Sequence, residues 1–355
     1  MELKLETVTK GIEPVSQEWR MKARDYLKNL AIPQGSLGEL LNLAEQLAAI
    51  KETLKPSVKK KIVVTMAGDH GVVEEGVSAF PQEVTPQMVA NFVAGGAAIN
   101  VLSEVAGARV IVVDMGVAAD LSELVEKGDI LSYKVDYGTK NMTQGPAMTR
   151  EQAQKALEAG IEIAGKLVEE GVELLGTGDM GIGNTTPSSA ILAALTGLSA
   201  CEVTGRGTGI SDEALENKIR VIEKALEVNR PDPNDALDVL AKVGGFEIGG
   251  IAGLILGAAF HKVPVVVDGF ISTAGALIAK GLAPNSADYM IASHKSVEGG
   301  HKFMWEELGL RPLLDLNFRL GEGTGAAVAM NIVESAAQVI SKMLTFEDAG
   351  VSRNV

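Results

Sequence analysis

Residues 172–191, VELLGTGDMGIGNTTPSSAI, join a short and mostly apolar run to a glycine-rich turn and then to the start of a helix. An apolar run without alternation is typical of a strand buried on both faces. The glycines at positions 176, 178 and 181 are spaced as G-x-G-x-x-G, and Asn184, Thr185 and Thr186 follow them with further hydrogen-bonding groups. A strand, a glycine turn and a helix in this order form the repeating unit of a parallel sheet. The stretch therefore predicts an α/β fold.

Four other apolar runs end in the same way, in glycine or in polar residues. They are KIVVTMAG (61–68), RVIVVDMG (109–116), VPVVVDGF (263–270) and ADYMIASH (287–294). Longer amphipathic segments lie between them, which favours a mainly parallel sheet with helices on both faces. Ligands of open α/β sheets bind beyond the carboxyl ends of the strands. We therefore expect the five strand ends to line one crevice.

The two ends of the chain read as helices, most clearly at 32–50 and 325–344. Neither belongs to the alternation of strands and helices. We expect a smaller helical domain formed by residues 1–60 together with 305–355, beside a large α/β domain over 61–304. Residues 120–148 are polar and rich in turn residues, and are interpreted as an excursion.

Several residues mark where helices begin or pack. Thr85–Pro86, Thr149 with Gln152, and Ser211 are typical helix starts. The segment 248–260 is apolar enough for a buried helix but too short to span a bilayer. Glycines within and just before this segment fall every fourth residue, on one helical face, where another element can approach closely: Gly245, Gly249, Gly253 and Gly257.

Composition limits the possible partners. The 355 residues carry 46 acids and 32 bases, a net charge of −14, which repels nucleic acids and anionic membranes. Cys201 is the one cysteine, so no internal disulfide forms, and the N-terminus lacks the apolar core of a signal peptide. We expect a cytoplasmic protein that binds small molecules.

Two turns indicate anion binding. The 176–181 turn precedes a helix, and a second glycine turn at 204–211 carries Arg206, with Lys218 two turns into the next helix. Amides at a helix start beside an ammonium bind anions. Each turn could also be a purely structural tight turn. Glu322 in RLGEGTG also has two interpretations, one structural and one functional. It either offsets a helix dipole or faces a ligand.

Metal chemistry has little support in the sequence. His70, His261, His294 and His301 are not spaced as metal ligands. His70 and His294 follow strands, and serve either as ligand contacts or as structural hydrogen-bonding groups. The loop VVVDGFISTAG partly resembles a diphosphate-binding loop, but Asp268 is followed by Gly269 where that loop needs paired acids for Mg²⁺. We expect no metal and no cofactor.

Nine segments in order resemble the nicotinate-nucleotide:dimethylbenzimidazole phosphoribosyltransferases, which make the lower-ligand nucleotide of cobalamin. The resemblance implies a Rossmann-like domain, a small domain built from both chain ends, and usually a homodimer. The segments are PQGSLGELLNLAEQLA, AGDHGVVEEGVSAFPQEVTPQMVANFVAGGAAINVL, GTKNMTQGPAMT, GTGDMGIGNTTPSSAI, TGRGTGIS, VGGFEIGGIAGLILGAA, VVVDGFIS, SHKSVEGGH and RLGEGTGAA.

The resemblance also implies a reaction and its residues. The family transfers phosphoribose from nicotinate mononucleotide to a benzimidazole nitrogen, with inversion and release of nicotinate. Glu322 occupies the position of the general base. The acceptor positions are Ser78, Phe80, Gln87 and Leu320, with Pro86 an alternative to Gln87. The donor positions are Asp179, Met180, Gly181, Gly207, Lys218, Gly269 and Ser296.

Three residues depart from the family pattern. Asp179 stands where glutamate is usual, Ile32 where lysine is usual, and Phe80 where tyrosine is common. These are either neutral changes or marks of relatives that glycosylate phenol or p-cresol, some of which pair two homologous subunits. A different class, a catalytically weak partner subunit, is disfavoured by the intact RLGEGTG. A third alternative is an NAD-dependent oxidoreductase. In that case G-x-G-x-x-G would bind the dinucleotide and Glu202 would be the acid that binds its ribose.

Overall fold

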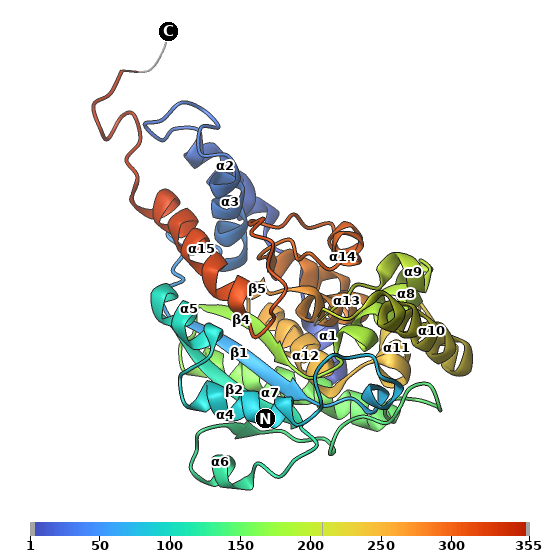
Figure 1. The fold of residues 1–355 in the computed structure, drawn as a ribbon. Helices are drawn as coiled ribbons and strands as arrows, with labels where there is room; N and C mark the ends of the chain where they lie inside the picture. Colours follow the sequence, from blue (N-terminus) through green and yellow to red (C-terminus); the bar gives the residue numbers. More distant parts are fainter. Residues whose placement is uncertain (1–3, 208, 353–355) are drawn as a thin grey trace.

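The computed structural model describes residues 4–207 and 209–352 and contains one six-stranded sheet in which every pairing is parallel. The strand order is β3-β2-β1-β4-β5-β6, which is the Rossmann order. Figure 1 shows the sheet between layers of helices. The strands are β1 (Lys61–Gly68), β2 (Ala108–Gly116), β3 (Leu131–Ser132), β4 (Leu174–Met180), β5 (Val265–Val267) and β6 (Met290–Ala292).

The alternating side chains of β1 show why both faces are covered. Ile62, Val64 and Met66 belong to one hydrophobic core, and Val63 and Ala67 belong to another. Successive strand residues point to opposite faces, so an apolar strand needs a helix layer on each side. The first core is built with α7 (Arg150–Glu169), α12 (Phe246–Phe260) and α13 (Phe270–Leu282). The second is built with α4 (Val84–Val93), α5 (Ala98–Ala106) and α15 (Thr324–Lys342).

The glycine face of α12 is confirmed as a close packing surface against α7. A Cβ on Gly253 would lie 1.9 Å from the carbonyl oxygen of Leu157, and one on Gly160 would lie 2.0 Å from that of Gly250. Both positions exclude any side chain. The helices therefore touch backbone to backbone.

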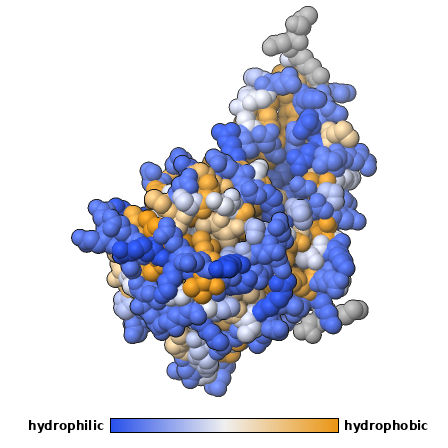
Figure 2. Space-filling model, turned by 90° about the vertical axis from the view of Figure 1, so that its right-hand side faces the viewer, coloured by the Kyte–Doolittle hydropathy of each residue, from blue (hydrophilic) through white to orange (hydrophobic). Residues whose placement is uncertain are grey.

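The remaining helices extend the molecule on two sides (Figure 1). At one end α3 (Glu39–Lys51) packs against α15 and against α2 (Gln17–Leu27), whereas α1 (Leu5–Gly11) packs on α12 and α7. Figure 2 shows this end projecting from the broader α/β body, with a mostly hydrophilic surface interrupted by apolar residues. The other helices are η1 (Gly71–Glu75), α6 (Ser122–Glu126), α8 (Thr185–Thr196), α9 (Ala200–Val203), α10 (Asp212–Asn229), α11 (Ala236–Val243), η2 (Pro284–Tyr289) and α14 (His301–Leu308).

Some expected boundaries are wrong. The excursion at 120–148 supplies the edge strand β3, and the helix expected over 32–50 begins at Glu39. Thr149 with Gln152 and Ser211 are confirmed as helix caps. Thr85 is not a cap, because α4 begins at Val84 after Glu83, and the Thr85 hydroxyl instead accepts the amide of Ile182 at 3.1 Å.

One stretch, Val84–Ala106, has the length and hydropathy of a membrane span, with 28% of its most apolar window buried. It is not one continuous helix. Residues Ala94–Ala97 separate α4 from α5, and Gly95 among them has φ +77°. Each piece, of 10 and 9 residues, is too short to cross a bilayer.

Candidate active site

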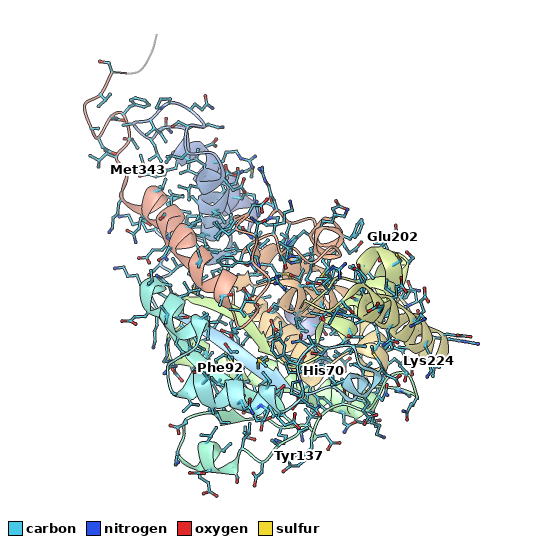
Figure 3. All side chains as sticks on the ribbon, viewed as in Figure 1. His70, Phe92, Tyr137, Glu202, Lys224 and Met343 are labelled. Carbon is cyan, nitrogen blue, oxygen red and sulfur yellow. The ribbon has the colours of Figure 1, made fainter. Side chains whose placement is uncertain are left out.

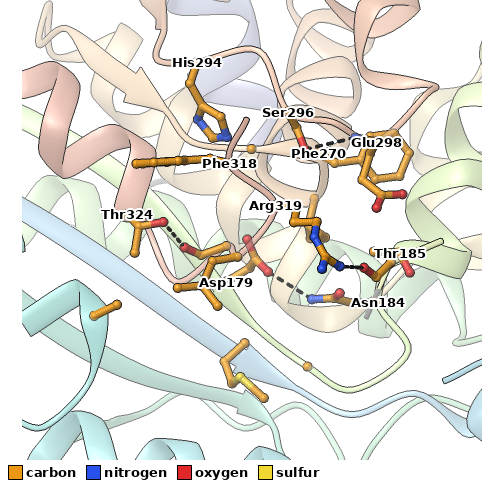
Figure 4. Close-up of a pocket in the computed structure, with 18 of the residues that line it drawn as sticks. Asp179, Asn184, Thr185, Phe270, His294, Ser296, Glu298, Phe318, Arg319 and Thr324 are labelled. Carbon is orange, nitrogen blue, oxygen red and sulfur yellow. Dashed lines mark hydrogen bonds between the residues drawn. The ribbon is translucent and has the colours of Figure 1, made fainter. Parts of the chain in front are cut away.

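A cavity of about 580 Å³ lies beyond the carboxyl ends of β4, β5 and β6. Figure 4 shows the residues that surround it. The ends of β1 and β2 do not contribute, so the expectation that all five strand ends share one crevice is wrong for these two. The cavity is completed from α5 and from the segment before α15. Its wall includes Ala98, Leu102, Phe270, Asn317, Phe318, Arg319, Leu320 and Thr324.

Eight of the sequence-predicted positions line this cavity. They are Phe80, Asp179, Met180, Gly181, Gly207, Gly269, Ser296 and Leu320. Four others do not contribute to the wall: Ser78, Gln87, Lys218 and Glu322. The Ser78 hydroxyl accepts the amide of Phe80 at 3.2 Å, and Gln87 is exposed on α4. Lys218 and Glu322 lie directly behind lining residues.

Glu322 sits in an unusual turn. Gly321, Glu322 and Gly323 have φ values of +86°, +65° and +98°, and a side chain at such an angle carries strain. The turn is held at both ends, because the Glu322 amide donates to the Asp179 carbonyl at 3.1 Å and its carbonyl accepts from the Thr65 hydroxyl at 2.8 Å. Strain of this kind persists where the surrounding structure fixes the residue, and it is common at functional sites.

Gly178 and Asp268 hold the Glu322 turn in place. A Cβ on Gly178 would lie 2.4 Å from the Glu322 carbonyl oxygen, so only glycine allows the approach. The two oxygens of Asp268 accept the amides of Gly323 and Ala326, each at 3.0 Å, and so cap α15. Burial raises the pKa of Asp268 to about 7, although backbone amides act in the opposite direction. The residue that caps α15 is therefore Asp268, and not Glu322.

The Glu322 carboxylate is directed at the start of α5. Its Oε2 accepts the Ile99 amide at 3.2 Å, and the residue is 5% exposed. Burial raises its pKa and the Ile99 amide lowers it, with a net increase. Ala98 and Gly321, on either side, line the cavity. A buried carboxylate with a raised pKa beside a cavity can act as a general base.

Asp179 presents a second carboxyl group to the cavity. Its Oδ2 accepts the Asn184 side-chain amide at 3.1 Å, and its Oδ1 has no hydrogen-bond partner among the described residues. Burial raises the pKa of Asp179 well above its usual value, and the neighbouring acids Asp268, Glu247 and Glu322 raise it further. A buried polar oxygen at a cavity wall is suited to a ligand hydroxyl.

The two turns that the sequence predicts to bind anions meet at Lys218, which is completely buried. Its Nζ donates to the Thr185 hydroxyl at 2.7 Å and to the Gly205 carbonyl at 3.4 Å. Burial lowers the pKa of Lys218 to about 8. Thr185 begins α8, so the ammonium and the positive end of a helix lie together behind the cavity wall.

The histidines that follow strands have different roles. His70 Nε2 pairs with Glu247 Oε1 at 2.8 Å in the interior, away from the cavity wall. Burial lowers the pKa of His70, but Glu247 and Asp69 more than offset this, so it is raised. His294 lines the cavity, and burial lowers its pKa to about 4. His70 is therefore structural, and His294 is neutral and available to a ligand.

The residues proposed for an NAD site serve other purposes. Gly176 and Gly178 lie within β4, where Gly178 admits the Glu322 turn. Glu202 lies at the molecular edge on α9 (Figure 3) and closes a capping box with Ser199, accepting its hydroxyl at 2.7 Å. No cluster of three or more His, Cys, Asp or Glu side chains suited to a metal occurs within 4–207 and 209–352.

Residues 12–351 match a family described as phosphoribosyltransferase, a class with which the fold and this site agree. The chain is 58% identical to nicotinate-nucleotide–dimethylbenzimidazole phosphoribosyltransferase of Syntrophotalea carbinolica, with 98% of this chain and 99% of the relative covered. It is 56% identical to the enzyme of that name from Geobacter sulfurreducens, with 99% of each covered.

A solved structure is also similar. The crystal structure of CobT from Thermus thermophilus superposes with a TM-score of 0.91 at 48% identity, covering 95% of this chain and 100% of that one. The chain therefore belongs to the nicotinate-nucleotide:dimethylbenzimidazole phosphoribosyltransferase family.

Several lining residues escaped sequence reasoning. Ala98 and Leu102 lie far from the predicted donor loops in the sequence, and the packing of α5 against α15 brings them to the cavity. Phe318 and Arg319 directly precede the predicted Leu320, but no local signal marks them as lining residues. Glu298 is only two residues after Ser296, in a segment already recognised, but an isolated acid there carries no local signal.

Proposed function

We propose that this chain moves the 5-phosphoribosyl group of nicotinate mononucleotide to 5,6-dimethylbenzimidazole, giving α-ribazole 5′-phosphate and nicotinate in cobalamin nucleotide-loop assembly. The observation that carries the proposal is the strained turn at Glu322, which sets a buried carboxylate beside a cavity that is also lined by the start of α8, with Lys218 behind it. The relatives named for this reaction support it.

The chemistry needs alignment and the removal of one proton. An acceptor ring nitrogen forms a bond to the anomeric carbon of the ribose as the bond to the nicotinate nitrogen breaks. The electron pair of that bond returns to the pyridinium nitrogen, so nicotinate leaves with an uncharged ring nitrogen, and the proton of the acceptor N–H passes to Glu322. The positively charged leaving group is already activated, so positioning and a general base supply the remaining acceleration.

The acceptor end is the apolar part of the cavity. Phe80 and Leu320 are 50% and 59% exposed, and they line it together with Leu102. Such side chains suit a flat aromatic ring beside the Glu322 turn. Ser78 and Gln87 are proposed as further acceptor contacts on the family pattern alone.

The donor end is the polar part. Thr185 at the start of α8, Gly207 and Ser296 line it, and Lys218 lies behind them. We assign the donor phosphate to this end and the ribose hydroxyls to the region of Asp179 and Gly269. No metal or cofactor is required in this scheme.

Incubating the purified chain with nicotinate mononucleotide and dimethylbenzimidazole tests the function, with products separated and weighed by mass spectrometry. Equimolar nucleotide and nicotinate are expected. The second candidate is transfer to phenol or p-cresol, which would account for the departures from the family pattern at Asp179, Ile32 and Phe80. A competition among dimethylbenzimidazole, adenine, phenol and p-cresol separates the two.

We also propose a cytoplasmic homodimer, with the two-part organisation of 1–60 plus 305–355 and 61–304. Val101 and Val105 on α5 are 56% and 73% exposed, which is costly for apolar side chains in a monomer and supports a covered surface. Pairing with a homologous chain is the alternative. Light scattering on the chain purified alone tests this, since a monomer would favour the heterodimer.

A further inference from the structure

Glu298 places an acid inside the anion-binding end of the cavity. It lies between β6 and α14, is 7% exposed, and lines the cavity. Its amide donates to the Ser296 hydroxyl at 3.3 Å, which holds it beside the residue assigned to the donor (Figure 4). An acid at a phosphate site repels the ligand unless its charge is removed.

The groups around Glu298 otherwise suit an anion. Lys218 on α10 and Arg319 before α15 both act on it through their positive charges, and the Gly207 amide faces it as well. The Arg319 Nη1 donates to the Gly207 carbonyl at 3.3 Å, which ties the two loops together across the cavity.

Two further charged groups belong to this end. Asp179 at the end of β4 accepts the Asn184 amide, and burial raises its pKa well above its usual value, which favours its uncharged form. Arg206, next to Gly207, is paired with Asp212.

α8 contributes Asn184 and Thr185, which are uncharged. His301 at the start of α14 is neutral at physiological pH, because burial and His294 lower its pKa to about 3.

One carboxyl oxygen of Glu298 is left without a partner. Its Oε2 is buried and accepts no hydrogen bond from the described residues. A Cβ on Gly205 would lie 1.9 Å from this oxygen, so glycine is required for the loop to close over it. A buried oxygen without a donor is poorly solvated when ionised, and burial raises the pKa of Glu298 despite the two cations.

The positive charges at this end of the cavity neutralise a bound phosphate only if the Glu298 carboxyl group is uncharged. A phosphomonoester carries close to two negative charges at pH 7. Lys218 and Arg319 supply two positive charges, and an ionised Glu298 would cancel one of them. When two acidic groups share a site, one of them takes up a proton.

We propose that Glu298 takes up a proton from solvent when the donor's phosphate binds, and that its carboxyl O–H then donates a hydrogen bond to a phosphate oxygen. This inference rests on the proposed function and deepens it. Glu298 is a specificity-determining residue that favours a terminal phosphomonoester over an uncharged ribose substituent.

The test is the calorimetric binding of nicotinate mononucleotide to the full chain at pH 7.5, in buffers with different ionisation enthalpies. The dependence of the observed heat on the buffer gives the number of protons taken up. We expect about one proton per donor bound, and an affinity that falls about tenfold per pH unit above this pH. Glu298→Gln should bind the donor with no proton uptake, because the amide donates a hydrogen bond without titrating.

Glu306→Gln, an exposed change on α14, is the matched control and should retain the uptake. Uptake near zero in the unmodified chain overturns the inference, whatever the variant does. Uptake that persists in Glu298→Gln also overturns it, because the proton then resides on the phosphate or elsewhere. A donor that does not bind the unmodified chain at all contradicts the proposed function instead.

Discussion

The Glu322 carboxylate accepts a hydrogen bond from the backbone amide of Ile99, with 3.2 Å between Oε2 and the nitrogen. Ile99 is the second residue of α5, so the carboxylate faces the positive end of that helix. This hydrogen bond holds Oε2 in place, and in the proposed reaction Oε1 is the oxygen that accepts the proton. Burial raises the pKa of Glu322, which makes the carboxylate a stronger base than a free one.

Replacing this base should nearly abolish turnover. Glu322→Gln keeps the size of the side chain but cannot take up a proton, so kcat should fall by about 10²- to 10⁴-fold. Steady-state kinetics with nicotinate mononucleotide and dimethylbenzimidazole measure the change. Circular dichroism should show a folded variant, and the exposed change Glu306→Gln should be neutral. Turnover close to that of the parent chain would remove Glu322 from this role.

The rate should also depend on pH in a defined direction. Glu322 must be ionised to accept a proton, and its pKa is raised above 4.5. With the donor saturating, the value of kcat/KM for dimethylbenzimidazole should therefore rise with pH through that raised pKa and then level off. Measured profiles of the parent chain and Glu322→Gln check this, and the acidic limb should be absent from the variant. A parent profile that stays flat down to pH 4.5 in folded protein contradicts the assignment.

Removing the buried ammonium should weaken donor binding selectively. Lys218→Met keeps the length of the side chain and removes the charge behind the phosphate end. Because a charge-assisted hydrogen bond contributes about 1.5–3 kcal/mol, the KM for nicotinate mononucleotide should rise by roughly 10- to 100-fold. The KM for dimethylbenzimidazole should change little. Lys224→Met, on the exposed side of the same helix (Figure 3), is the control; equal effects of both changes would contradict the prediction.

The close approach beneath the catalytic turn gives a test of backbone packing. Gly178→Ala would place a Cβ 2.4 Å from the Glu322 carbonyl oxygen, so the turn must shift. Overpacking of this kind costs about 1–3 kcal/mol, and the displaced carboxylate should reduce kcat as well. Gly299→Ala, where a Cβ meets nothing within 4 Å, should leave both unchanged. Denaturant unfolding and kinetics measure the pair, and indistinguishable variants would argue against the packing account.

The sequence predicts the fold well where the physical signal is local. Five apolar runs correspond to β1, β2, β4, β5 and β6, and the glycine face of α12 packs as expected because small residues are required wherever two backbones touch. The edge strand β3 escapes prediction because two exposed residues leave no apolar pattern. β5 and β6 are shorter than expected, with three residues each. The run that contains β6 begins inside η2, and the run that contains β5 ends at the first residue of α13.

The site was predictable only in part, since its wall is assembled from distant segments. The glycine turns and RLGEGTG locate Asp179, Gly207 and the Glu322 turn. The cap of α15 by Asp268 joins residues 55 or more positions apart, which no local pattern shows. Thr85 is a similar case. The Thr85–Pro86 pair is typical of a helix start, but the Thr85 hydroxyl accepts a hydrogen bond from the Ile182 amide instead.

The most direct test of the central claim is the product of the reaction. The purified chain is incubated with nicotinate mononucleotide and dimethylbenzimidazole, and the nucleotide formed is analysed by mass and by the NMR coupling of its anomeric proton. The account predicts α-ribazole 5′-phosphate and nicotinate in equal amounts, with the configuration inverted. No nucleotide product with dimethylbenzimidazole, benzimidazole, adenine or phenol, from chain that is folded, would contradict it.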